Sequence, residues 1–159
     1  MTIRDTSVLA VGVTLLLATG HAFAGSEADD ARKKAKRATS YVMLAETVSR
    51  VSLQVGGMTD REPFDKALAW YARSLGRLHV QLYDKLTPPE GVESLHAKYK
   101  SAVAEFAQMA EAHYKADYPT ARKHREKCVK EFIQAVGQLA KLKRDGVMPS
   151  VSHGGGRRD

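Results

Sequence analysis

Apolar residues recur at steps of three and four along most of the chain, which is the spacing of one face of an α-helix. The sequence predicts four such helices, and segments containing Gly-Gly, Pro-Pro and Asp-Tyr-Pro separate them. The predicted ranges are 27–55, 60–86, 90–116 and 120–143. Because the connectors are short, neighbouring helices should be antiparallel, and we predict an all-α fold, an up-down-up-down four-helix bundle.

The boundaries of these helices rest on residues that start or stop helices. Gly56 and Gly57 are predicted to end the first helix, and Thr59 is predicted to cap the second, with Glu62 as its capping-box partner. Each helix carries an apolar stripe that should face the core. The stripes are Tyr41, Ala45, Val48, Ser52 and Val55; Phe64, Leu68, Tyr71, Leu75, Leu78 and Leu82; Val92, Leu95, Tyr99, Ala102, Phe106, Met109 and His113; and Ala121, Cys128, Phe132, Ala135, Leu139 and Leu142.

Residues 1–24 have the pattern of a cleavable bacterial signal peptide. Arg4 lies in a short polar segment, residues 8–18 are apolar, and Ala22-Phe23-Ala24 is a small-x-small cleavage site. We therefore expect the mature chain to begin at Gly25 and to lie in the periplasm or outside the cell. The alternative is that the leader is kept as a membrane anchor.

Composition and charge are those of a globular protein with a positive surface. The 159 residues are 43% hydrophobic, and the formal net charge is +7, which favours anionic lipid, lipopolysaccharide or cell-wall polymers as partners. We expect no nucleic acid as a partner of an exported protein. No later segment approaches the roughly 20 apolar residues of a membrane helix, so the cleaved chain should not be an integral membrane protein. The bundle should occupy 25–145, and 146–159 should be a disordered tail.

Two features could recognise an anionic or protein partner. The first is a basic run, which either meets an anionic surface or is a solvated face paired with the acids before it. The second is Trp70, which falls off the second stripe near Arg73 and Arg77 and either anchors a partner or covers the edge of the core. The basic run consists of Arg32, Lys33, Lys34, Lys36 and Arg37.

Histidine, cysteine and methionine residues near one turn allow a metal site. If the turn between the third and fourth helices centres between Tyr118 and Pro119, His113 faces His124, and Met109 faces Cys128. These donors suit copper or, with fewer ligands, zinc. The alternative is packing alone, since Met and Cys fill cores well. The predicted metal ligands are Met109, His113, His124 and Cys128.

The single cysteine and two further histidines can each be interpreted from their positions. Cys128 cannot form an internal disulfide. If it is exposed, the basic residues around it would lower its pKa and make it reactive, whereas at a buried stripe position they would have no effect. His79 and His96 are symmetric about the turn after the second helix, and we predict that they are surface or boundary histidines.

The chain resembles the soluble cytochrome b562 family in its size, its export signal and the Thr87-Pro88-Pro89 segment after the second helix. That family holds haem with a Met near the start of the first helix and a His near the end of the fourth. Here the fourth helix ends in Leu139–Lys143 without His, and the first has no Met before Met43. The sequence also lacks the Cys-x-x-Cys-His motif of covalent haem attachment, so haem binding is not predicted.

The sequence carries no recognisable enzyme motif. It has no Gly-x-Ser-x-Gly, and carboxylates such as Glu105 and Glu111 lie on polar faces, where no apolar pocket would shift their pKa. We therefore predict a non-enzymatic helical bundle of the cell envelope that binds a protein partner or an anionic envelope component. The alternative is a periplasmic bundle that binds copper or zinc. A homodimer formed through helix pairing or Cys128 is a third possibility.

Overall fold

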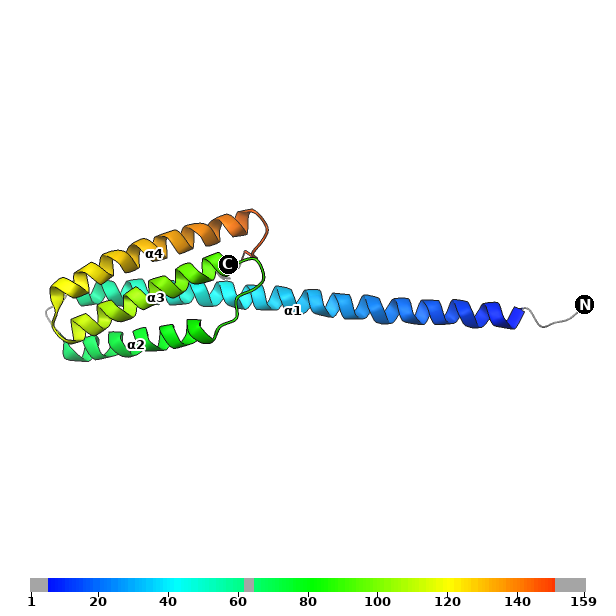
Figure 1. Ribbon diagram of the computed structural model, residues 1–159, viewed down its shortest axis with the longest axis horizontal. Coiled ribbons are helices and arrows are strands. Elements are labelled where there is room, and N and C mark those ends of the chain that lie inside the picture. The colour runs from blue at the N-terminus through cyan, green and yellow to red at the C-terminus, as the bar shows by residue number, and fades with distance from the viewer. Residues whose placement is uncertain (1–5, 62–64, 151–159) are drawn as a thin grey trace, which may run out of the picture. The chain divides into compact units, whose positions relative to one another are not determined.

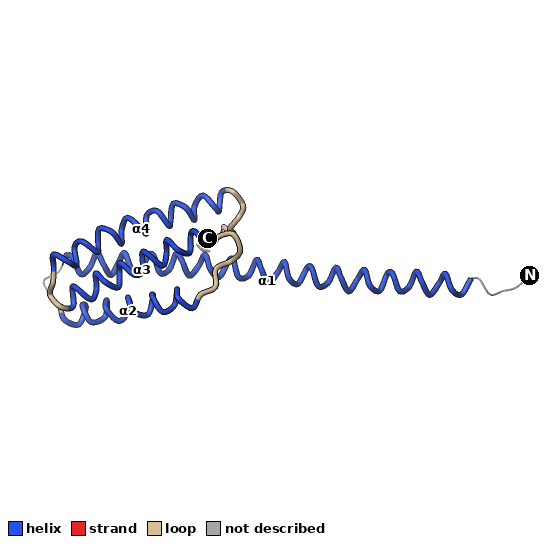
Figure 2. The backbone as a smooth tube through the Cα atoms, viewed as in Figure 1, coloured by secondary structure: helices blue, strands red, loops and turns tan. Residues whose placement is uncertain are grey.

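The computed structural model describes residues 6–61 and 65–150, with side chains for 27–59 and 65–150. Short loops join the last three helices to one another (Figure 2). Within the described residues there is no β-strand, so the prediction of an all-helical protein with four helices is confirmed. The helices are α1 (Thr6–Arg61), α2 (Lys66–Lys85), α3 (Glu93–Tyr114) and α4 (Tyr118–Arg144).

The chain forms two compact units, residues 1–37 and 38–159. In the first unit, residues 27–37 of α1 are all exposed. The predicted leader, 1–24, lies outside the residues whose side chains are described, so the signal peptide stays a prediction. The second unit holds the remainder of α1 together with α2, α3 and α4 (Figure 1), and it contains the hydrophobic core.

The core of the second unit includes the stripes predicted on α1, α3 and α4. Every predicted stripe residue of these three helices is buried except Leu142, which is partly buried. Aromatic rings fill the centre: the Tyr83 and Tyr99 ring centroids lie 5.9 Å apart, and the Tyr99 and Phe132 centroids lie 6.4 Å apart. The three-and-four spacing therefore located the inner faces of these helices correctly.

The boundary predicted between the first two helices is wrong. Helix α1 continues through Gly56 and Gly57 to Arg61. A Cβ atom placed on Gly56 would lie 3.6 Å from the Met109 sulfur, so this glycine packs against α3 instead of ending the helix. The Thr59 hydroxyl donates to the Gly56 carbonyl within α1, and α2 is capped by Asp65, whose carboxylate accepts hydrogen bonds from the first amides of that helix. Tertiary packing here overrides the low helix propensity of glycine.

The inner face predicted for α2 is also wrong. Tyr71 and Leu78 are 49% and 58% exposed, Leu68, Leu75 and Leu82 are only partly buried, and Phe64 lies outside the described residues. The helix instead buries a face about 100° further round, made largely of small side chains. The residues of this inner face are Ala69, Ala72, Gly76, His79 and Tyr83.

The chain stays with the core beyond the end of α4. The amides of Val147 and Met148 donate to the Leu142 carbonyl, and the Met148 side chain is buried in the core. Met148 therefore packs with the bundle, although the sequence pattern assigned it to the tail. Residues 151–159 lie outside the described residues.

Candidate functional site

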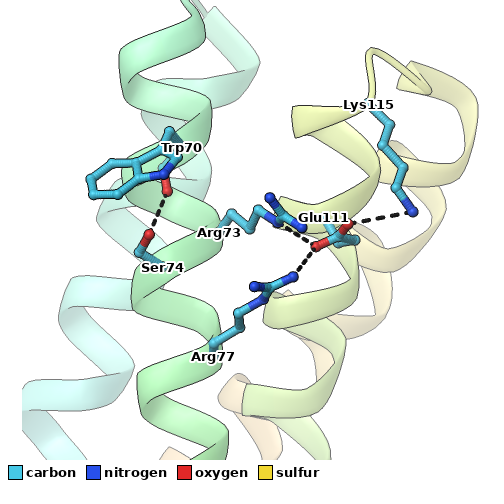
Figure 3. Close-up of polar contacts among 6 residues, drawn as sticks. All are labelled: Trp70, Arg73, Ser74, Arg77, Glu111 and Lys115. Atoms are coloured by element: carbon cyan, nitrogen blue, oxygen red, sulfur yellow. Dashed lines mark hydrogen bonds and ion pairs between the residues drawn. The ribbon is translucent and has the colours of Figure 1, made fainter.

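Three cationic side chains, two from α2 and one from the residue that caps the end of α3, surround one carboxylate on the surface of the bundle (Figure 3). Arg73 Nε donates to Glu111 Oε2 at 2.6 Å, and Arg77 Nη2 donates to the same oxygen at 3.2 Å. Lys115 Nζ lies 3.3 Å from the other oxygen. The hydrogen bond from Arg73, followed by that from Lys115, lowers the pKa of Glu111 below its ordinary value. We call these four residues the cationic cluster.

The cationic cluster is held in place by its least exposed member. The Arg73 guanidinium lies 4.5 Å above the centre of the Tyr114 ring, a cation–π contact that fixes its position while it binds Glu111. Arg77 and Lys115 are far more accessible, with 60% and 66% of their side chains exposed. The cluster thus has one structural arginine and two outward cations.

Trp70 lies one turn before the cationic cluster on α2 and is 59% exposed. In Figure 3 its indole points away from α3, whereas Arg73 and Arg77 reach toward Glu111 on that helix. The Ser74 hydroxyl donates to the Trp70 carbonyl at 2.9 Å, so this contact involves the Trp70 backbone and leaves the indole exposed. The exposed position agrees with the sequence prediction that Trp70 falls off the packing stripe.

The chemistry of this surface favours an anionic ligand. Three cations and one carboxylate leave an excess of two positive charges, and Glu111 holds the cations in place without neutralising them all. A ligand carrying phosphate or carboxylate groups would meet charge-assisted donors on Arg77 and Lys115. The sequence pattern indicated Arg73 and Arg77 beside Trp70 but not the ion pair of Glu111 and Lys115, although these two residues have i,i+4 spacing at the end of α3.

The basic run of α1 forms a second positive surface. Arg32, Lys33, Lys34, Lys36 and Arg37 are all exposed. Lys33 lies 3.5 Å from Asp30, with 74% and 70% of the two side chains exposed, and such exposed pairs contribute less than about 1 kcal/mol. The run is therefore accessible to an anionic partner. Its Lys33–Asp30 ion pair is more exposed than any ion pair that Glu111 makes in the cationic cluster, so Lys33 is less firmly held.

The four predicted metal ligands each have another role. His113 is buried, and its ring lies edge-on to Tyr118 at 5.7 Å. His124 Nδ1 lies 2.7 Å from Glu105 Oε2, while Met109 and Cys128 pack in the core. In the part of the chain with described side chains, no three His, Cys, Asp or Glu residues gather as a metal site. The fold thus accounts for these residues by packing and hydrogen bonding.

Cys128 is a buried thiol. Burial, together with the Glu105 carboxylate, raises the pKa of Cys128 to about 12. The thiol is therefore protonated at neutral pH and inert. Of the exposed and buried positions that the sequence allowed for Cys128, the structure selects the buried one.

The prediction that His79 is a surface or boundary residue is wrong. His79 is buried, its Nδ1 lies 3.0 Å from the Ser52 hydroxyl of α1, and its ring lies 6.0 Å from that of Phe106. Burial lowers its pKa. His96 is partly buried between Tyr41 and Tyr83, and burial followed by the charge of Lys100 lowers the pKa of His96 as well.

We expect the bundle to lose stability in mild acid because of His79. A histidine pKa lowered in the folded state means that the unfolded chain binds the proton more readily. The free energy of unfolding should therefore have its full value above the ordinary histidine pKa of about 6.5. It should decrease as the pH falls below about 6.5 toward the lower pKa that His79 has in the folded protein. Denaturant titrations at pH 7.5 and 5 should show a smaller decrease in the free energy of unfolding for His79→Gln than for the unsubstituted protein. Equal losses in both proteins would contradict the assignment.

Comparison with known proteins gives no further guidance, since no protein family, curated protein or solved structure matches the chain. Among the helices whose side chains are described, none is long and apolar enough to cross a membrane.

Proposed function

We propose that this protein is a non-enzymatic helical bundle of the bacterial cell envelope that binds an anionic envelope component. The leader pattern of residues 1–24 supports export, with cleavage before Gly25. The net charge of +7 supports an anionic partner because a positive protein attracts and orients anions over several ångströms.

The antiparallel, up-down-up-down arrangement of the helices belongs to this proposal. It is supported by the order of contacts between neighbours, in which later residues of one helix meet earlier residues of the next. Lys100 contacts Asp84 whereas Glu111 contacts Arg73, and His124 contacts Glu105 whereas Gln138 contacts Ser94.

The cationic cluster is the observation that carries the proposal. Arg77 and Lys115 present two exposed cations whose positions are set by Glu111 and, through it, by the Arg73–Tyr114 contact. An ordered pair of cations loses less side-chain entropy on binding than cations on an unordered surface. Trp70 beside them offers a large, rigid contact surface of the kind that anchors partners.

Charge-removing variants test this site against the other positive surfaces. Arg77→Gln with Lys115→Gln should weaken binding to soluble polyphosphate by about 2 kcal/mol, or about thirtyfold, at about 1 kcal/mol for each cation. The double variants R32Q/K36Q on the basic run and R122Q/K123Q on α4 each remove one exposed arginine and one exposed lysine, so the three proteins have equal net charge. Both of these should lose much less affinity.

The measurement is a calorimetric titration of polyphosphate into the protein. The protein is produced with its leader and purified from the periplasm, and its mass should be that of a chain beginning at Gly25. Equal losses in all three variants would show that net charge alone drives binding, and the site would be rejected. A loss confined to R32Q/K36Q would move the function to the basic run. The absence of polyanion binding by the unsubstituted protein would reject the function itself.

A further inference from the structure

Part of the outer surface of α2 is apolar, although an exposed helix face is normally polar. Trp70, Tyr71 and Leu78 are among the most exposed large apolar side chains of the bundle. They lie on neighbouring turns around Ser74, within three or four residues of it, so they form one continuous patch. We call these three side chains and Ser74 the α2 patch.

The α2 patch results from how α2 packs. The helix turns its small residues inward, where Gly76 meets the backbone of Ala107 on α3, and this close packing leaves the larger residues outside. Isolated exposed apolar residues need no explanation, but a contiguous aromatic and aliphatic patch marks an interaction surface.

The charges at the edge of the α2 patch indicate its occupant. Arg77, which directly precedes Leu78 and lies two turns from Trp70, is 60% exposed and belongs to the cationic cluster with its excess of two positive charges. At the two ends of α2, Lys66 and Lys85 are also exposed. An apolar strip with tryptophan and tyrosine, bordered by arginine and lysine, is the pattern of helices that lie in a lipid–water interface.

We propose that the α2 patch and the cationic cluster dock this protein on an anionic phospholipid surface. Trp70, Tyr71 and Leu78 enter the boundary between headgroups and acyl chains, while Arg77 and Lys115 bind lipid phosphates. This inference rests on the proposed function, because it names the lipid surface as the anionic component. A phosphate polymer offers the charge but gives the three apolar side chains nothing to enter.

Trp70 is the only tryptophan of the chain and reports directly on docking. With vesicles of phosphatidylglycerol, its fluorescence maximum should shift to shorter wavelength, and with vesicles of phosphatidylcholine it should not. Leu78→Ser should lower the partition coefficient onto the anionic vesicles about tenfold, since binding strength scales with buried apolar area. The control Ile133→Ser removes a side chain of similar exposure on α4 (64% against 58%) and should leave the partition coefficient within twofold.

Four outcomes decide the matter. The shift together with the L78S loss supports lipid docking. If the protein binds polyphosphate and R77Q/K115Q weakens this binding about thirtyfold, but vesicles cause no shift, lipid docking is overturned while the proposed function stands. If L78S and I133S behave alike, the α2 patch is not the docking surface. If the Trp70 maximum shifts with protein concentration alone and sedimentation shows a dimer, a second copy covers the patch, and lipid docking is again overturned.

Discussion

Replacing Phe106 with alanine should lower the free energy of unfolding by about 3–5 kcal/mol. The ring is fully buried on α3, the helix that packs against both α2 and α4. It also lies 6.0 Å from the His79 ring. Removing it takes away contacts with the helices around it and leaves a cavity that this rigid bundle can close only in part.

The size of this effect would be decisive because small domains have total stabilities of only about 5–15 kcal/mol. Denaturant titration followed by circular dichroism measures it. The matched control is Ile133→Ala, which shortens a side chain that is 64% exposed on α4 and should change stability by less than about 0.5 kcal/mol. Equal losses in the two variants would place Phe106 outside the core.

The periodicity of the sequence predicted the helices well because three of them carry a single stripe of large apolar residues. On α3 the stripe from Leu95 to Met109 has no rival face, and burying it satisfies both the hydrophobic effect and the helical period. The structure confirms that stripe at every position. Where one face is clearly more apolar than the rest, the sequence contains the information that packing uses.

Helix α2 was mispredicted because it has two candidate faces. One holds leucines and Tyr71, while the other holds small residues with His79 and Tyr83. Large apolar area favours burying the first face, but close approach of two backbones favours the second, since small residues let helices pack more tightly. The periodicity of apolar residues does not indicate how closely two helices pack. The prediction based on it therefore placed the face with the larger apolar side chains in the core.

The predicted metal ligands lie in a different register from the one that the sequence pattern indicated, because the turn between α3 and α4 lies elsewhere. The sequence pattern centred the turn at 118–119, but α3 ends at Tyr114 and α4 begins at Tyr118. This displacement brings His124 opposite Glu105 instead of His113, eight residues away. At about 1.5 Å per residue, Glu105 and His113 lie about 12 Å apart along α3.

The cationic cluster was not predicted because it, too, depends on the position of a turn. Its ion pairs join residues 34 and 38 positions apart, so they follow from where the loop between α2 and α3 lies. The sequence placed the start of the third helix at residue 90, whereas α3 starts at Glu93. Only the pair of Glu111 and Lys115, the C-cap residue of α3, is four residues apart and could be expected from spacing alone.

Replacing Gly76 with alanine should destabilise the bundle by about 1–3 kcal/mol, although alanine is the better helix former. A Cβ atom on Gly76 would lie 2.8 Å from the Ala107 Cα atom and 3.2 Å from its Cβ atom. The nearest atom is backbone, so no side-chain rotation relieves the clash, and α2 must move away from α3. Ala107→Gly would remove only the second contact and should restore only part of the loss.

Gly137 provides the matched control because it also lies within a helix, yet nothing lies within 4 Å of a Cβ atom placed on it. Gly137→Ala should therefore stabilise the protein by up to about 1 kcal/mol, so the two glycine substitutions should have opposite signs in denaturant titrations. If Gly76→Ala were stabilising too, α2 would not pack through its small residues. Its leucine stripe would then face the core and the helix would rotate, which would withdraw Tyr71 and Leu78 from solvent. The α2 patch therefore depends on the close approach of Gly76 to Ala107, and this substitution tests the surface without touching any residue on it.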